Sequence, residues 1–158
     1  MSLRVDMGMR WEDQNIIKKD GEWTVDGRPT INVDVAWHET PSNALGKAFV
    51  GLKVTAPRNA ATPPHTHGGS AVSATVIQGR VLNQMVCGAY TIGPKVYEKG
   101  ESWYEAPGCH HVRSENVGDE EAVFIASMIT DEKRIAEMGL LRALVVIDAD
   151  LEGEAGKR

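Results

Sequence analysis

The sequence predicts an all-β protein, built as an antiparallel sandwich or barrel, with one short helix near the C-terminus. Glycine and proline turn signals recur at short intervals, for example at residues 26–29, 93–94 and 107–108. Short β-branched or alternating runs lie between these signals, at positions 31–37, 49–55, 72–77, 80–85, 95–98 and 122–129. Many short strands punctuated in this way are typical of antiparallel sandwiches and barrels.

Two segments show the clearest periodicity. In residues 31–37 (INVDVAW) every second side chain is apolar, which is the pattern of a half-buried strand. The four apolar positions are Ile31, Val33, Val35 and Trp37. Residues 131–144 (DEKRIAEMGLLRAL) instead predict a helix packed outside the barrel, because apolar residues recur there at helical spacing. That stripe consists of Ile135, Met138, Leu141 and Leu144.

Length and composition favour one soluble domain spanning residues 1–158. Within it we expect a barrel over about 23–130, the helix over 131–144 and a solvated tail over 151–158, with VVIDAD as a final strand or dimer contact. The net charge of −5 argues against nucleic acid or an anionic membrane as a partner. The first 15 residues do not resemble a signal peptide, and two cysteines are too few for a disulfide framework. We therefore expect free thiols at Cys87 and Cys109 and a cytoplasmic location.

Four of the five histidines fall into two tight groups, PPHTHGG and APGCHHVRSEN. In an extended chain His65 and His67 point to the same side, so both can reach a single ion. The second group follows the turn at residues 107–108, at the start of another strand. Neutral imidazole is the commonest metal ligand in proteins. The local chemistry is equally compatible with surface histidines that cap loops.

The first group resembles the first of the two motifs of the cupin superfamily, which consists of jelly-roll barrels. That motif contains a His-x-His pair, then three or four intervening residues, a glutamate, and a closing glycine after six more residues. Here His65-Thr66-His67 matches the pair and Gly79 matches the closing glycine, but the glutamate position is Val72. The glycine that opens the motif is replaced by Asn59 or Ala60.

The second group resembles the other cupin motif, in which a Pro-x-Gly turn precedes a histidine and an asparagine. Gly100 matches its opening glycine, and residues 106–108 stand at the turn. The motif's spacing selects His111 and not His110, while Asn116 is one position late. The match covers roughly residues 48 to 129 and is similar to small single-domain cupins of the quercetin-dioxygenase type.

The resemblance implies one divalent metal ion bound by His65, His67 and His111. Loss of the glutamate means either loss of metal or a three-histidine site similar to that of acetylacetone-cleaving dioxygenases, and we favour the second. With Val72 in place of a carboxylate, the ion keeps its full charge and attracts an anionic, chelating substrate. Iron(II) is the favoured ion, with zinc, nickel, manganese and copper as alternatives.

Other residues near the motifs are candidates for the pocket wall. Arg113 shares the strand face of His111, where it can hold an anionic group, or it pairs with Glu115 on the surface. Gln84 and Glu105 can hydrogen-bond a substrate, although the sequence does not place them. His110 points away from His111 and takes a structural or rim role.

The leading functional hypothesis is a metal-dependent dioxygenase that cleaves a small enolisable or dicarbonyl substrate. The alternatives are a non-redox isomerase, lyase or decarboxylase using the same ion, and a non-catalytic small-molecule-binding cupin. We also expect a homodimer formed through the N-terminal strands.

Overall fold

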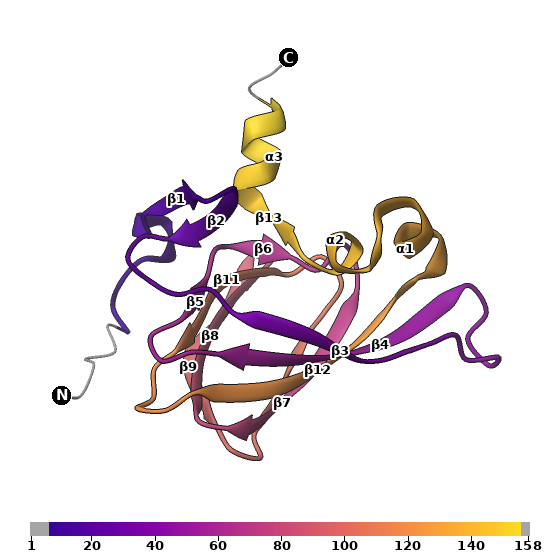
Figure 1. Ribbon diagram of the computed structural model, residues 1–158, viewed down its shortest axis with the longest axis horizontal. Coiled ribbons are helices and arrows are strands. Elements are labelled where there is room, and N and C mark those ends of the chain that lie inside the picture. Colours follow the sequence, from indigo (N-terminus) through magenta and orange to yellow (C-terminus); the bar gives the residue numbers. More distant parts are fainter. Residues whose placement is uncertain (1–6, 156–158) are drawn as a thin grey trace.

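Alternating burial along the strands builds a barrel from two antiparallel sheets (Figure 1). The computed structural model describes residues 7–155. The first sheet has the order β10-β7-β12-β4-β3. Its strands are β3 (Asn32–Glu39), β4 (Lys47–Ala56), β7 (Ala71–Gln78), β10 (Ser102–Glu105) and β12 (Ala122–Asp131). The second sheet has the order β13-β6-β11-β8-β9, with β5 paired to β11. Its strands are β5 (Ala61–Thr62), β6 (His65–Thr66), β8 (Arg80–Cys87), β9 (Tyr90–Glu98), β11 (His110–Asn116) and β13 (Val146–Ile147).

The inner faces of these sheets form the apolar core. Strands β4 and β12 pair over ten positions, and every second side chain of β12 is buried. The inward side chains of β4, β7 and β12 include Val50, Leu52, Val54, Val72, Ala74, Val76, Phe124, Ala126 and Met128. Each strand-like run of the sequence falls in an observed strand, except that Ile31 directly precedes β3, so the predicted all-β jelly roll is confirmed.

A β-bulge in β3 changes the face on which Trp37 lies. Val35 pairs with Leu52 but Trp37 pairs with Gly51, which leaves one extra residue between them. Trp37 therefore leaves the face predicted by simple alternation and packs over Gly51, with its ring 5.4 Å from that of Phe49. Val35 is 48% exposed, so the sequence overstates how much of this strand is buried.

We expect Gly51→Ala to lower the free energy of unfolding by about 1–3 kcal/mol, because it overpacks this contact. A Cβ atom added at Gly51 would lie 2.3 Å from the indole of Trp37. Urea denaturation measures the loss. In a Trp37→Ala background the same substitution should cost much less, and an equal cost in both backgrounds would contradict the packing argument.

The C-terminal segment forms two short helices where one was predicted. Gly139 has φ 84° and ends α1 (Glu132–Met138) before α2 (Leu140–Leu144) begins. The expected stripe is therefore interrupted: Leu144 is buried, whereas Met138 and Leu141 are 40% and 49% exposed. Residues of the predicted solvated tail continue as helix α3 (Asp148–Ala155), and 156–158 lie outside the described residues. None of the helices within residues 7–155 has the length and apolar character needed to cross a membrane.

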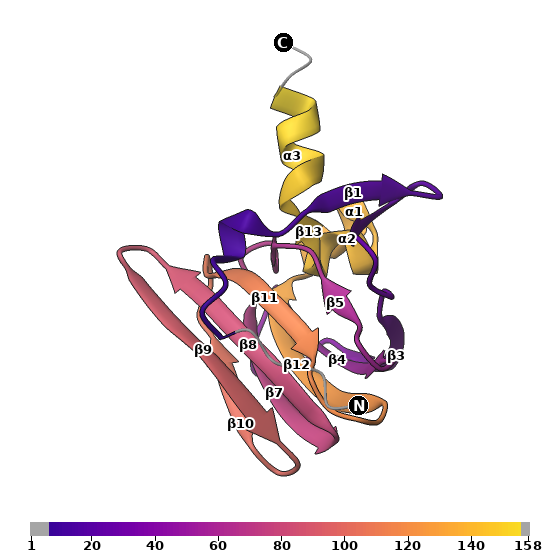
Figure 2. The ribbon, with the colours of Figure 1, turned by 90° about the vertical axis from the view of Figure 1, so that its left-hand side faces the viewer.

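The N-terminal segment covers the same end of the barrel as these helices (Figures 1 and 2). It contains the short 3-10 helix η1 (Trp11–Asp13) and a hairpin of β1 (Ile16–Lys19) and β2 (Glu22–Val25). This hairpin is a separate two-stranded sheet, so the barrel proper begins at β3 and not near residue 23. The Trp23 Nε1–H group donates a hydrogen bond of 2.7 Å to Asp150 Oδ1 and links the hairpin to α3.

A buried network of two salt bridges links the segment before β3 to β11. The Glu115 carboxylate accepts hydrogen bonds from Arg28 and from Arg113, and both Glu115 and Arg113 are buried. Arg28 also donates to the carbonyl oxygen of Asn59 at 2.9 Å. Burial alone would raise the pKa of Glu115, but the two guanidinium groups outweigh it and lower that pKa below its ordinary value of 4.5.

Ionised Glu115 is therefore expected to stabilise the fold above its ordinary pKa. This contribution is lost as the pH falls through the lowered pKa of the folded state, because both states then bind the proton. Glu115→Gln should destabilise the protein near neutral pH, and the difference from the unmodified protein should shrink below about pH 4.5. Urea denaturation across the acidic range measures this. Glu98→Gln, in the exposed pair with Arg80, is the control and should have little effect at any pH; a difference for Glu115→Gln that is constant with pH would contradict the assignment.

Candidate metal centre

Three of the five histidines converge at one place inside the barrel. His65 lies on β6, His67 follows that strand directly, and His111 on β11 is the register partner of His65. All three are buried, and each offers a ring nitrogen within 4.8 Å of the others. The ring of His65 lies 4.9 Å from each of the other two rings. The structure thus brings together the three residues that the sequence selected; that they bind a metal stays a prediction.

Each ring is oriented by a hydrogen bond from its outer nitrogen. His65 Nδ1–H donates to the carbonyl oxygen of Pro63 at 2.8 Å, and His67 Nδ1–H donates to that of Leu144 at 2.9 Å. His111 Nε2–H donates to Asn83 Oδ1 at 2.7 Å. In the neutral imidazole the remaining nitrogen of each ring is then free to offer its lone pair to a metal ion.

The C-terminal segment helps to build this arrangement. Strand β13 pairs with β6, so that Ile147 lies opposite His65. Gly68, with φ +60°, permits the close approach: a Cβ atom there would lie 2.3 Å from the carbonyl oxygen of Ala143. Because Gly68 has no side chain, the backbone of α2, which orients His67, can lie directly against the loop that follows His67.

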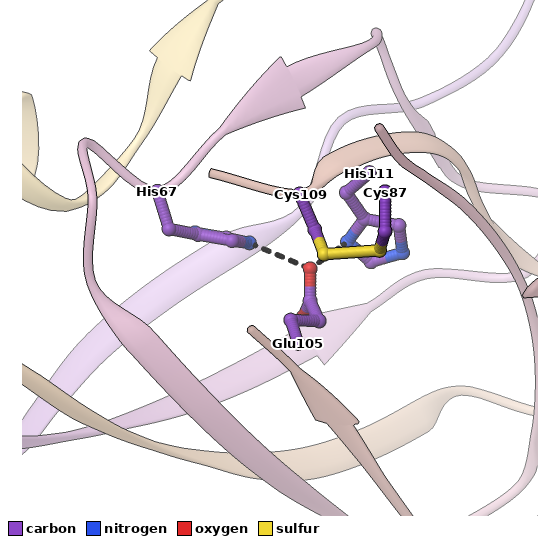
Figure 3. The surroundings of a disulfide bond; sticks show 5 residues. All are labelled: His67, Cys87, Glu105, Cys109 and His111. Carbon is purple, nitrogen blue, oxygen red and sulfur yellow. Dashed lines mark ion pairs between the residues drawn. A yellow bond between two sulfur atoms is a disulfide. The ribbon is translucent and has the colours of Figure 1, made fainter. Parts of the chain in front are cut away.

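A fourth group, Glu105, completes the cluster. Its Oε1 atom lies 3.2 Å from His67 Nε2 and 3.3 Å from His111 Nδ1, and its side chain is buried (Figure 3). Glu105 ends β10, where it is paired directly with Val72 on β7. Residues paired across antiparallel strands point to the same face, and both side chains line the same cavity. A carboxylate on the neighbouring strand therefore lies beside the three histidines, although the motif's glutamate position is Val72. The three-histidine ligand set stays a prediction, and Glu105 is a candidate fourth ligand.

The electrostatics of the cluster suit ligands for a cation. Burial lowers the pKa of His65 well below its usual value, and it also lowers the pKa of His111. Burial would raise the pKa of Glu105, but His111 and His67 outweigh it and the pKa is lowered. Burial opposes the charged form of His67, yet its contact with Glu105 raises its pKa overall. Glu105 is therefore a carboxylate, and His65 and His111 are neutral imidazoles at ordinary pH.

Two unsatisfied atoms support a fit to a divalent cation. His67 Nε2 and Glu105 Oε1 are buried, and neither makes a hydrogen bond of good geometry despite their separation of 3.2 Å. Leaving such polar atoms unsatisfied is costly, and a cation held between them would satisfy both. Three imidazoles and one carboxylate suit first-row transition metals such as iron, nickel, zinc and manganese.

The other predicted pocket residues behave differently. Val72 lines the cavity, but Arg113 and Gln84 do not. A bulge between His111 and Arg113 shifts the register on β11, so Arg113 leaves the face of His111 and Ser114 lines the cavity instead. Arg113 pairs with Glu115, as the alternative prediction had it, but inside the protein and not on its surface.

His110 stands apart from the cluster, as predicted. Its Nε2 atom lies 3.0 Å from Asp148 Oδ1 at the start of α3, and its side chain is 43% exposed. Asp148 also donates its backbone N–H to the carbonyl oxygen of Pro64 at 3.0 Å. His110 therefore attaches α3 to the rim of the site.

The two cysteines form a disulfide beside the cluster (Figure 3). Cys87 ends β8 and Cys109 precedes β11, so the bond anchors the start of the strand that carries His111. The prediction of free thiols is wrong for this structure, because two cysteines that are distant in sequence meet across neighbouring strands. The cytoplasmic location was predicted partly from free thiols, so the cysteines no longer support it and it stays a prediction.

Comparison with known protein families matches residues 29–148 to the family described as Cupin. The chain belongs to the cupin family. The matched range contains all four residues of the cluster and extends beyond the motif region found in the sequence. A comparison with curated proteins finds no match.

Solved structures confirm the cupin fold. An oxalate oxidase shares 21% identity with a TM-score of 0.52, covering 85% of this chain and 69% of that one. An oxalate oxidase in complex with the substrate analogue glycolate gives 19% identity and a TM-score of 0.51, and the match covers 97% of this chain and 77% of that one. Peruvianin-I, a cysteine peptidase from Thevetia peruviana latex, shares 20% identity with a TM-score of 0.51. The match covers 65% of this cupin and 64% of Peruvianin-I. At these identities the likeness establishes the fold alone.

Proposed function

We propose that this cupin is a metal-dependent dioxygenase that cleaves a small enolisable substrate, such as a β-dicarbonyl compound, with iron(II) as its metal. The observation that carries the proposal is the buried group of three imidazoles and Glu105 facing an apolar cavity. When bound there, iron(II) would polarise the substrate's oxygen atoms and supply electrons to dioxygen. We also propose that the protein is a cupin of the quercetin-dioxygenase type with a metal site similar to that of acetylacetone-cleaving dioxygenases.

The protein's own residues supply binding, orientation and exclusion of water. His65, His67 and His111 are fixed in direction by their outer hydrogen bonds. Glu105 neutralises one of the two charges of a divalent ion, so an anionic enolate is still attracted, though less than by a carboxylate-free site. Apolar side chains such as Trp103, Phe124 and Met128 line the remaining wall and keep the local dielectric low.

The size of the cavity limits the reacting group. The cavity has a volume of about 50 Å³ beside the four cluster residues. One water molecule requires roughly 10–15 Å³ by this measure, so the space accepts a head group of only a few non-hydrogen atoms. A chelating pair of oxygens on a short carbon skeleton fits that description.

Oxygen uptake by the reconstituted protein tests the proposal. The metal-free protein is loaded anaerobically with iron(II) or with zinc, and oxygen consumption is followed with a panel of β-dicarbonyl compounds. We expect consumption with iron only, with one dioxygen used per substrate cleaved, and none with the His67→Ala variant. Turnover with zinc, nickel or manganese and no oxygen consumption would overturn the dioxygenase in favour of a lyase, isomerase or decarboxylase. Ligand binding with no turnover by any metal would favour a binding protein.

The homodimer also remains a proposal. The β1–β2 hairpin lies outside the barrel and belongs to the N-terminal segment expected to mediate pairing. Light scattering of the intact chain and of a chain shortened before β3 would show whether this segment is needed.

A further inference from the structure

A second, larger cavity lies next to the metal centre. It has a volume of about 480 Å³, which is within the usual range for small-molecule sites. Its walls come from the β1–β2 hairpin, the start of β3, β5 and the segment from α2 to α3. The β1–β2 hairpin, β13 and α3 lie together at one end of the barrel (Figures 1 and 2). We refer to this space as the outer cavity and to the space beside the histidines as the inner cavity.

The two cavities share four lining residues, which we call the ring. The residues that line both are Ile31, Val33, Thr62 and Val145. Thr62 pairs with Ser114 across β5 and β11, and Ser114 lines the inner cavity. The ring is therefore the boundary through which a molecule in the outer cavity would reach the histidines.

Thr62 carries an unsatisfied hydroxyl group in this ring. The residue is only 9% exposed, and its buried Oγ1 atom makes no hydrogen bond. A buried hydroxyl group that nothing in the fold satisfies lowers the stability of the protein. Its position at the junction of two cavities points to a ligand atom as its partner.

The outer cavity has an apolar floor and a charged rim. Leu141, Val145, Ile147 and Pro63 contribute apolar surface, and Trp23 is held in place by its hydrogen bond to Asp150. The charged rim residues are Lys18, Glu22, Arg142 and Asp150. Because two are basic and two acidic, the rim does not favour one sign of charge, and the floor selects an apolar group.

We infer that the substrate spans both cavities, with an alkyl or aryl tail in the outer cavity and the tail-side oxygen of its chelating pair hydrogen-bonded to Thr62 in the ring. Its chelating head lies among the histidines and Glu105. This inference rests on the proposed function for the head group, and it adds the tail site and the role of Thr62. The substrate class is thus an enolisable carbonyl compound with an apolar substituent, and not a bare two- or three-carbon acid.

Binding of two matched ligands tests the tail site. Acetylacetone and 1-phenylbutane-1,3-dione have the same chelating head, and only the second carries an aryl tail. Titration into the cobalt(II)-loaded protein, followed by the visible spectrum, should give about tenfold tighter binding of the phenyl compound, because its ring is buried. Leu141→Asp should abolish that preference. Met138→Asp is the control, since Met138 is similarly exposed on the adjacent helix but lines neither cavity. Equal affinities of the two ligands, or equal effects of the two variants, would overturn the tail site.

Two substitutions of Thr62 test the hydrogen bond. Thr62→Val keeps the shape and removes the hydroxyl, so it should weaken binding of the phenyl compound about tenfold without lowering the free energy of unfolding. Thr62→Ser keeps the hydroxyl and should bind within about threefold of the unmodified protein. Indistinguishable affinities for the valine and serine variants would overturn the assignment of Thr62.

Failure of the metal site is distinguishable from failure of the tail site. If cobalt(II) does not bind, the proposed function fails, and amide chemical shifts of the metal-free protein then report on the tail site alone. Addition of the phenyl compound should still perturb the amides of residues 22–23, 62 and 141–147. Perturbation confined to other regions, or none at all, would overturn the inference by itself.

Discussion

Glu105→Gln is expected to lower the affinity for iron(II) or cobalt(II) by at least about 100-fold. The substitution keeps the size of the side chain but removes the negative charge that lies 3.2 Å from His67 and 3.3 Å from His111. Because the site is buried, the lost attraction is only weakly screened by water. Competition titration against a chelator of known affinity measures the change.

A swap between paired strands gives this prediction its sharpest control. Glu105 and Val72 are register partners with side chains on the same face. Glu105→Val should lose metal affinity, and adding Val72→Glu in the same chain should restore a large part of it. Glu121→Gln, at an exposed position remote from the cluster, should leave affinity unchanged. Unchanged affinity in Glu105→Gln would show that the carboxylate is no ligand and would return the site to three histidines.

His67→Ala and His111→Ala are expected to abolish metal binding at micromolar metal, whereas His110→Ala retains it. The first two remove lone pairs that face the common point, and each loss leaves an incomplete donor set. His110 is directed to Asp148 and contributes nothing to that point. Metal content after dialysis, measured by mass spectrometry, is the readout.

Circular dichroism separates loss of ligand from loss of fold in this series. Most of the barrel core consists of apolar side chains on β4, β7, β8 and β12, so all three variants should retain the β spectrum. Equal metal loss in the His110 and His111 variants would show that the choice between these neighbours is wrong.

The sequence was sufficient for the fold and for the histidines because both depend on local patterns. Alternating apolar residues and Gly/Pro turns predict short strands, and a His-x-His pair on an extended segment necessarily points one way. Gly79 and Gly100 adopt φ of +82° and +85°, which explains why the motif positions require glycine.

Features that depend on strand register were not accessible in this way. Glu105 could be named but not placed, because its role depends on which residue of β7 it opposes. Its position in the second motif, directly before the Pro-x-Gly turn, was the one available signal. Bulges in β3 and β11 moved Trp37 and Arg113 to unexpected faces, since one extra residue reverses the alternation. The disulfide likewise depends on the register of β8 and β11, which brings Cys87 and Cys109 together.

Anomalous diffraction from crystals of the cobalt(II)-loaded protein tests the central claim most directly. We predict one peak inside the barrel, within about 2.0–2.2 Å of His65 Nε2, His67 Nε2, a ring nitrogen of His111 and a carboxylate oxygen of Glu105. A peak bound by the three histidines with Glu105 turned away would contradict the role given to that carboxylate. A peak elsewhere, or no peak under loading conditions, would contradict the metal centre itself.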